Sequence, residues 1–391
     1  MKTLSGGLLR LVLSLVFLST PLHAQVPASP PAPGLIVVDV PLLLPPQPGV
    51  RTAADIAHIE VRQANGVGGA VFTQRVSPDA TKMLATVGKQ IEKLYPGRMK
   101  TGRTEITFTG FVSALDLNAS GLALLIALDS LYGGWTIAPG FMAMGGYDAD
   151  RDVQPVNDAM PRLFAALKAS AKRVVMSEKQ VAQVTDLMIT SGPLAFSSTQ
   201  FFSVNAYEDV RAIADIKISP EMEKVDENFT DAQKKLRAPG AKPADVLSDP
   251  DVQESLRQTL TASPACLSAR LLLRANSARL EKLSLEGTLN AIEALAPTVF
   301  AAVQSATPYD LRLLPNAVVQ AEIDRLLETK QQFDARALPL LDAVIGYGEA
   351  VRTYTEKPPD SAAENAARNR TLTLTAREVL GVLLKFKSGK R

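Results

Sequence analysis

The chain has 391 residues, of which 46% are hydrophobic and 21% are charged, and its net charge is +2. This length and composition are typical of a globular protein with two domains and not of a disordered chain. A net charge near zero gives no electrostatic reason to expect nucleic acid or acidic lipid as a partner. Cys266 is the only cysteine, so an intrachain disulfide is excluded.

Residues 1–24 have the three parts of a secretory signal peptide. Lys2 and Arg10 precede the apolar run Leu11–Leu18, and small residues at the end of the segment form a cleavage site. We expect cleavage after Ala24. The apolar run is too short for a permanent anchor, and no other segment has the length of a membrane span. The sequence therefore predicts an exported protein of the periplasm or exterior without a stable membrane anchor.

Histidine is scarce, and this limits the possible chemistry. Of the two histidines, His23 leaves with the signal peptide and His58 remains. One histidine cannot build a metal site with paired histidines, and its predicted place at the entry to a strand disfavours a Ser-His or Cys-His pair. Serine or threonine with lysine is the remaining option for covalent catalysis. We predict neither a metal site nor a cofactor.

Residues 25–54 are predicted to be a proline-rich linker, parts of which lie against the folded body. Eight prolines occur between Val26 and Val50, and this density favours an extended chain. The first domain is expected to begin at Asp55. Its first two strands, Ile56–Arg62 and Gly69–Gln74, are separated by a glycine-rich loop that is typical of a hairpin.

A helix opening at Pro78 follows, and after it comes Gly97–Thr104, which nearly matches a phosphate-binding P-loop. Arg103 stands where that motif needs lysine, and a strand is expected where a helix must begin, so we do not predict nucleotide binding.

The stretch Asp116–Gly134 is the centre of the domain. Asn118 or Ser120 can cap the incoming helix, the residues after Gly121 leave almost no polar face, and a glycine pair ends it. It is therefore predicted to be a buried helix entered through a turn of small residues. Such a turn suits a capped core helix, and it also suits a nucleophile or an anion site beside free N–H groups.

The remaining elements of this domain alternate strands with helices. The predicted strands are Trp135–Met144, Val153–Val156, Arg173–Met176 and Phe201–Val204, and the predicted helices are Asp158–Ala171, Lys179–Thr185 and Tyr207–Ile213. The pattern indicates an α+β domain over residues 55–217.

Four sequence blocks in this domain resemble the proteolytic domain of the Lon protease family, serine peptidases with a Ser-Lys dyad. Asp116–Gly121 is similar to the family's Asp-Gly-Pro-Ser-Ala-Gly, and Ala143–Gly146 to its Met-Thr-Gly-Glu. Val153–Val156 is similar to Val-Leu-Pro-Ile, and Lys172–Ser177 to Lys-Thr-Val-Leu-Ile-Pro. The intervals between the blocks match without a gap. The resemblance implies an α+β Lon-type proteolytic domain (ribosomal-protein-S5-domain-2-like).

The same resemblance places both dyad positions on residues that cannot do the family's chemistry. The position of the nucleophilic serine holds Ala119, and the position of the lysine holds Arg162. Alanine has no oxygen with which to attack, and arginine stays protonated and cannot act as a general base. Ser120, the next residue, is the candidate for a displaced nucleophile, with Lys168 or Lys172 as its base.

Residues 218–391 are predicted to form an all-α domain. The expected helices are Pro220–Leu236, one from Pro250, Ala265–Leu280, Leu285–Ala302, Asn316–Phe333, Leu338–Tyr354, and a last one that a capping box at Ser361 opens. A helix bundle is the default arrangement, and a tetratricopeptide-like hairpin of the third and fourth helices is the alternative.

Two functions are compatible with these observations. The first is a catalytically inactive pseudoprotease that acts as a binding or scaffold module for a protein or peptide partner. The second is an active, ATP-independent serine endopeptidase that uses Ser120. The family resemblance also implies possible self-assembly into a homo-oligomer.

Overall fold

The computed structural model describes residues 34–45, 52–66, 68–110, 114–148, 150, 152–217, 220–275, 282–304, 311, 314–356 and 359–388. The predicted signal peptide and its cleavage site lie outside the described residues. Contacts within the chain separate residues 1–34 from residues 35–391, and every helix and strand below belongs to the second unit.

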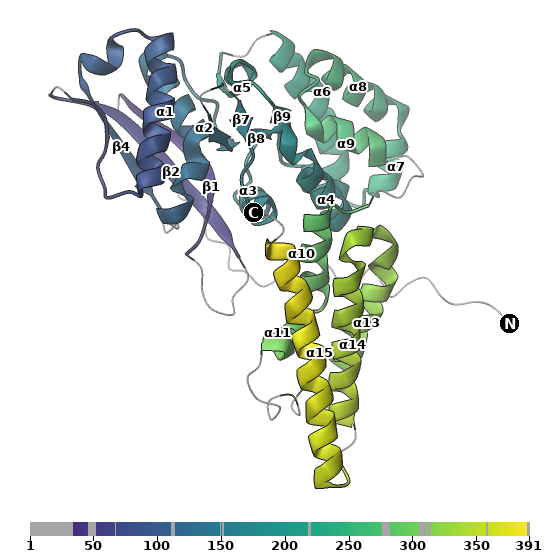
Figure 1. Ribbon diagram of the computed structural model, residues 1–391. Coiled ribbons are helices and arrows are strands. Elements are labelled where there is room, and N and C mark those ends of the chain that lie inside the picture. Colours follow the sequence, from purple (N-terminus) through teal and green to yellow (C-terminus); the bar gives the residue numbers. More distant parts are fainter. Residues whose placement is uncertain are drawn as a thin grey trace. The chain divides into compact units, whose positions relative to one another are not determined.

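A mixed seven-stranded sheet forms the centre of the first half of this unit (Figure 1). Its spatial order is β3-β4-β2-β1-β5-β8-β9. β2 pairs antiparallel with β1 and β4, and the other neighbours are parallel. The strands are β1 (Leu35–Leu43), β2 (Ala54–Ala64), β3 (Gly69–Phe72), β4 (Arg103–Thr109), β5 (Phe141–Met144), β8 (Arg173–Ser177) and β9 (Gln200–Val204). β6 (Gly146–Tyr147) and β7 (Val153–Gln154) form a separate small hairpin.

Part of the predicted linker is a central strand of this sheet, so the linker prediction is wrong for Leu35–Leu43. β1 pairs with β2 along its whole length and with β5 at Asp39. Val38, Val40 and Leu42 are buried at alternate positions, which is the period of a strand with one face in the core. The surrounding prolines concealed this short pattern in the sequence.

The predicted hairpin of β2 and β3 is also wrong, although both strands exist. β4 lies between them, antiparallel to β2 and parallel to β3. Helix α1 (Pro78–Leu94) connects β3 to β4, and Ser77 caps it by accepting a hydrogen bond from the Ala80 N–H. A parallel pair needs such a long connection. The glycine-rich loop therefore redirects the chain without pairing the strands that it joins.

The central helix is present as predicted, and of its two predicted caps Ser120 does not act as one. α2 (Gly121–Gly133) follows a 3₁₀ segment, Ala114–Ser120, and every residue from Gly121 to Ser130 is buried. Gly134 ends the helix in the left-handed conformation with φ of 70°. Ser120 occupies the cap position without a side-chain capping bond, and the side chain of Asn118 is outside the described set.

Helices and strands alternate after α2, and the predicted elements are found with shifted ends. The helices are α3 (Ala159–Lys168), α4 (Val181–Ser191) and α5 (Tyr207–Ala214). The predicted strand Trp135–Met144 shortens to β5. The fold is thus α/β with a mixed sheet, followed by a helical region.

The C-terminal region is helical as predicted. Its helices are α6 (Pro220–Arg237), α7 (Pro243–Ser248), α8 (Pro250–Ala262), α9 (Leu267–Ala275), α10 (Leu285–Leu295), α11 (Pro297–Gln304), α13 (Asn316–Thr329), α14 (Leu338–Glu356) and α15 (Ala362–Ser388). The single helix predicted over Leu285–Ala302 is divided at Ala296, because Pro297 has no N–H for the preceding turn and starts a new helix. The Ser361 hydroxyl accepts a bond from the Glu364 N–H (3.1 Å), in agreement with the predicted capping box.

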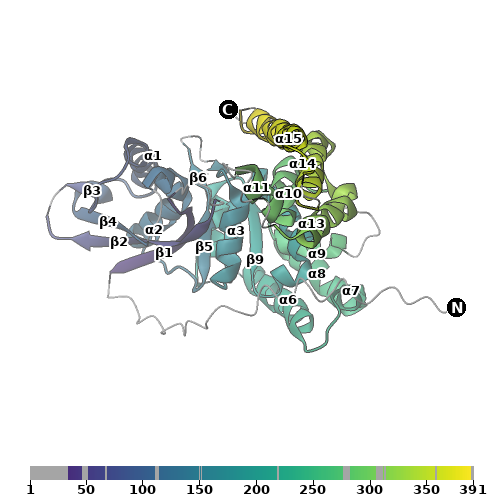
Figure 2. The same cartoon turned by 90° about the horizontal axis from the view of Figure 1, so that it is seen from below.

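Packing divides the chain later than the predicted boundary at residues 217 and 218. The first hydrophobic core runs from Val38 to Leu272 and includes residues of α6 to α9, and the second begins at Leu283. The Ser203 N–H on β9 donates to the Ala265 carbonyl just before α9 (2.9 Å), which attaches these helices to the sheet (Figure 2). Within the described ranges, no helix is both long and apolar enough to cross a bilayer.

Candidate functional site

Arg162, which the sequence resemblance aligns with a lysine, is held in the protein interior. Its side chain is 1% exposed and comes from the first turns of α3. Nε donates to the Asn157 carbonyl (3.0 Å), Nη1 to the Pro41 carbonyl (2.9 Å) and Nη2 to Asp116 Oδ1 (2.5 Å). The guanidinium thus ties α3 to β1 and to the segment that enters α2.

Asp116 is the counter-charge of Arg162 and makes a second connection of its own. Its Oδ2 accepts a bond from the Leu43 N–H at the end of β1 (2.7 Å). A buried guanidinium is tolerated when it has a counter-charge and its N–H groups have acceptors, and both conditions are met here. Arg162 and Asp116 therefore form a structural ion pair, and its cation cannot take a proton.

Ser120, the candidate nucleophile, is fully buried at the entry to α2. Its hydroxyl donates to the Leu117 carbonyl, and its Oγ lies 3.8 Å from Met83 Sδ. The N–H of Leu122 donates to the Gly145 carbonyl (3.0 Å), so one N–H at this helix start is already used. In this conformation, Ser120 has the contacts of a packed residue.

Of the two lysines considered as bases, Lys172 lies toward the other end of β5. Lys172 packs against Gly140, before β5: its N–H donates to the Gly140 carbonyl (2.9 Å). Ser120 belongs to the turn that contacts Gly145, after β5. Four strand residues rise about 13 Å, which separates the two groups by far more than a hydrogen bond. Lys168 ends α3, about 9 Å along the helix axis from Arg162.

A second buried polar cluster, which sequence reasoning missed, lies at the other end of α2. Asp129 is fully buried and accepts hydrogen bonds from the hydroxyls of Tyr95 (2.6 Å) and Tyr207 (2.7 Å). Burial, together with the neighbouring carboxylate, raises the pKa of Tyr95 to about 12 and that of Tyr207 well above its ordinary value. The cluster joins α1, α2 and α5. The sequence signal that could have revealed this cluster was Asp129, an aspartate inside an otherwise apolar helix.

A third cluster joins the two cores. Asp186 on α4 accepts bonds from the N–H of Ser284 (2.7 Å) and from its hydroxyl (2.5 Å), while the Ser284 Oγ caps α10 by accepting from Gly287 N–H (2.9 Å). Burial raises the pKa of Asp186. A side chain at Gly287 would lie 2.3 Å from this carboxylate, so glycine is required by space.

Cys266 and His58 both make contacts of a structural kind. Cys266 is buried, and burial raises the pKa of its thiol to about 12, which keeps it protonated. His58 Nδ1 lies 2.7 Å from Asp39 Oδ1 on the sheet surface, and this bond raises the pKa of His58. No group of three or more metal-ligating side chains occurs among the described residues.

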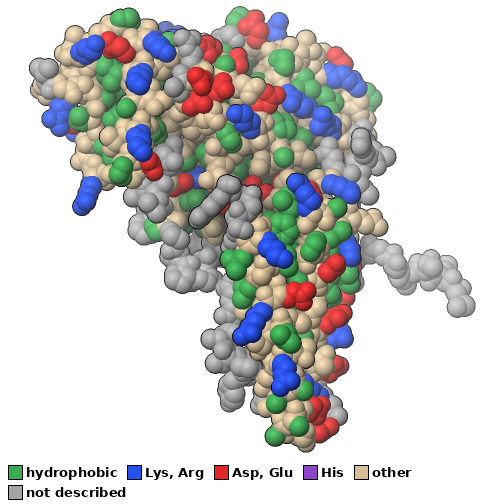
Figure 3. Space-filling model, in the orientation of Figure 1, with side chains coloured by type: hydrophobic (Ala, Val, Ile, Leu, Met, Phe, Trp, Pro, Cys, Tyr) green, Lys and Arg blue, Asp and Glu red, His purple; other side chains and the backbone are tan. Residues whose placement is uncertain are grey.

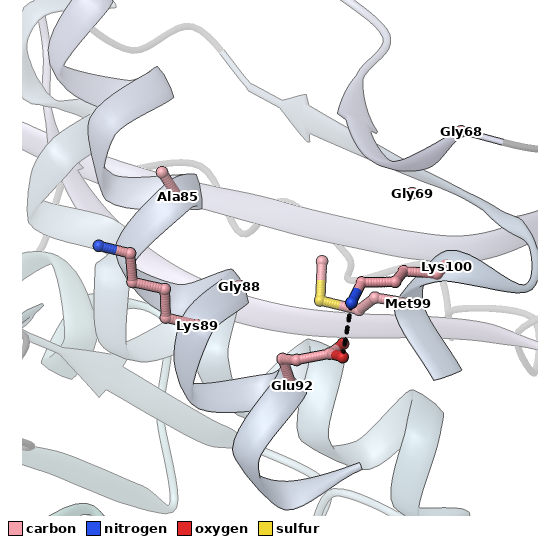
Figure 4. Close-up of a pocket in the computed structure, with 8 residues that line it drawn as sticks. All are labelled: Gly68, Gly69, Ala85, Gly88, Lys89, Glu92, Met99 and Lys100. Atoms are coloured by element: carbon pink, nitrogen blue, oxygen red, sulfur yellow. Dashed lines mark ion pairs between the residues drawn. The ribbon is translucent and has the colours of Figure 1, made fainter. Parts of the chain in front are cut away.

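An open groove of about 530 Å³ lies between α1, the 3₁₀ turn Arg98–Lys100 and the start of β3 (Figure 4). Its apolar lining is Ala85, Gly88 and Met99, and its other lining residues are Gly68, Gly69, Lys89, Glu92 and Lys100. Figure 4 shows the Lys100–Glu92 ion pair (3.1 Å) reaching from the turn to α1. Glu92 also accepts a hydrogen bond from the Gly97 N–H. The bond from Lys100 is the main cause that lowers the pKa of Glu92. This volume is within the range of ligand pockets, about 300–1,000 Å³.

Basic and acidic side chains are interspersed on the face of the molecule in Figure 3.

A comparison with protein-family models finds no match, and a comparison with curated proteins finds none either.

Proposed function

We propose that this chain is an exported, catalytically inactive relative of the Lon proteolytic domain that acts as a binding or scaffold protein. The observation that carries the proposal is the state of Arg162. At the position where the resemblance places a catalytic lysine, the chain has a guanidinium with three hydrogen-bonded groups, a partly buried counter-charge and 1% exposure.

The chemistry of the two dyad positions supports an inactive protein. Ala119 supplies no nucleophile, and Arg162 cannot serve as a base because a guanidinium has no site that accepts a proton. Loss of the nucleophile alone costs about 10⁶-fold in kcat in a well-studied serine protease, and loss of the base as well adds little. The buried Ser120, whose hydroxyl donates to the Leu117 carbonyl, offers no evident replacement.

The positions of the resembling blocks support the family part of the proposal. Asp116–Gly121 enters the buried helix α2, Gly145 contacts the first turn of that helix, and Lys172–Ser177 contains β8 of the mixed sheet. These blocks are distant in the sequence and lie around one short strand, β5. Self-assembly and export are further parts of the proposal that rest on the resemblance and on residues 1–24.

The test is labelling of the purified protein, without residues 1–24, with a fluorophosphonate probe for active serines. The variants are Ser120→Ala and, as a matched control, Ser198→Ala, which replaces an exposed serine. We expect no labelling of any of the three proteins. Labelling of the wild type and of Ser198→Ala that disappears in Ser120→Ala would show a working nucleophile and overturn the proposal.

A further inference from the structure

One edge of the sheet is open, and the other is covered. At the covered edge, β9, the Phe201 N–H donates to Ser268 Oγ (2.8 Å) and the Ser203 N–H to the Ala265 carbonyl (2.9 Å). At the opposite edge, β3 pairs with β4 alone among the described residues. Strands that end a sheet in this way can accept another extended chain.

The register of β3 shows which backbone groups face outward. The Gly69 N–H donates to the Gly102 carbonyl (3.2 Å) and the Thr73 N–H to the Ile106 carbonyl (2.9 Å), both on the β4 side. In a parallel pair, alternate residues direct their N–H and C=O groups to the same neighbour. Ala70 and Phe72 therefore direct their backbone groups away from β4, toward the open edge.

The groove described above adjoins this edge, because Gly68 and Gly69 belong to its lining. A Cβ at Gly88 would make van der Waals contact with Met99 Cε (3.4 Å), so a larger side chain there would occupy the apolar part of the groove. Side chains of a strand added to β3 alternate between the two faces of the sheet, so every second one is placed on the α1 side, where the groove lies.

The charge of the groove specifies the occupant further. Glu92 is engaged by Lys100 and by the Gly97 N–H, whereas Lys89 is in no ion pair with a described residue. Figure 4 shows the Lys89 ammonium at the rim of the groove, directed away from Met99, and a cation at this rim is complementary to an acidic side chain. A second copy of this chain would bring another positive lining to the same edge.

We propose that β3 and this groove bind an extended peptide segment of a partner protein, in which apolar residues alternate with acidic ones. The segment adds to the open edge of the sheet through the backbone of Ala70 and Phe72. Its apolar side chains contact Ala85, Gly88 and Met99, and an acidic side chain pairs with Lys89. This inference rests on the proposed function, since it names the class of partner that a non-catalytic module binds.

The experiment measures the fluorescence anisotropy of a labelled seven-residue peptide of alternating valine or leucine and glutamate, titrated with the purified protein. A twin peptide with lysine in place of glutamate tests the charge, and an N-methylated twin without the donors for β3 tests the backbone pairing. We expect saturable binding of the glutamate peptide and binding at least about tenfold weaker for both twins.

Protein variants test the location. Gly88→Leu fills the groove and favours the helix, and its matched control is Gly381→Leu, a helical glycine of α15 with open space around it. Lys89→Glu reverses the charge, and its control is Lys82→Glu on the same helix, where Lys82 is 79% exposed. We expect Kd to rise about tenfold in Gly88→Leu and about threefold in Lys89→Glu, and to stay unchanged in both controls.

The outcomes separate this inference from the proposed function. Equal binding by wild type and Gly88→Leu, equal binding of the N-methylated peptide, or no binding at all would overturn the inference and leave the inactive-protease proposal in place. Mass spectrometry of the same samples shows whether the peptide stays intact. Cleavage by the wild type and not by Ser120→Ala would instead overturn the proposed function.

Discussion

Removal of the Asp116 carboxylate tests whether Arg162 is a structural residue. Asp116→Ala leaves a guanidinium that is 1% exposed without its counter-charge, and it also removes the acceptor of the Leu43 N–H. Breaking a buried ion pair by deleting one partner costs about 3–5 kcal/mol in free energy of unfolding. The loss is expected to be large because the Arg162 side chain, 1% exposed, would keep its charge without a counter-charge.

Urea unfolding followed by tryptophan fluorescence measures this loss, since Trp135 is the only tryptophan and belongs to the first core. The control is Lys82→Ala, which breaks an exposed pair with Asp79 and should cost below about 1 kcal/mol. The double variant Asp116→Ala/Arg162→Met should regain part of the stability, because the orphaned charge is gone. A loss of less than about 1 kcal/mol in free energy of unfolding for Asp116→Ala would refute this reasoning. A double variant no more stable than Asp116→Ala would also refute it.

Three further predictions concern the other polar clusters. Tyr207→Phe removes a donor from the buried Asp129 and should lower the free energy of unfolding by about 1.5–3 kcal/mol in urea titrations; no change would contradict the role of this bond. Gly287→Ala places a methyl group 2.3 Å from the Asp186 carboxylate and should lower the free energy of unfolding by about 1–3 kcal/mol. The readout is proteolysis between the two cores, and an unaltered digestion pattern would contradict this prediction. The His58 pKa is raised by its carboxylate partner, so its stabilisation is complete below the unfolded value of 6.5 and is lost as the pH rises through the folded value. His58→Gln should therefore flatten the dependence of Tm on pH between about pH 6 and 8. An unchanged slope would exclude His58 as the source of this pH dependence.

Local patterns were sufficient where a segment's structure follows from its own residues. The helix after Gly121 was predictable because apolar residues on all sides indicate burial, and Gly134 ends it for a conformational reason. The Ser361 cap was readable because its partner is three residues away. In such places, sequence and structure agree.

Elements that depend on distant partners were not predictable. β1 was not predictable because a short run flanked by prolines becomes a strand here only through its hydrogen bonds with β2. β2 and β3 were paired wrongly because a turn signal does not show that β4 enters between them. The family resemblance and the chemistry of arginine excluded Arg162 as a base, but its interior position depends on Asp116 and Pro41, 46 and 121 residues away.

Turnover of an unfolded protein substrate tests the central claim most directly. Fluorescein-labelled casein is incubated with the wild type, with Ser120→Ala and with the exposed-serine control Ser198→Ala, and release of labelled peptides is followed over time. The account predicts the same background release for all three proteins, because the positions that the proposed resemblance assigns to the dyad hold Ala119 and a buried Arg162. Release by the wild type and the control that is abolished in Ser120→Ala would contradict it.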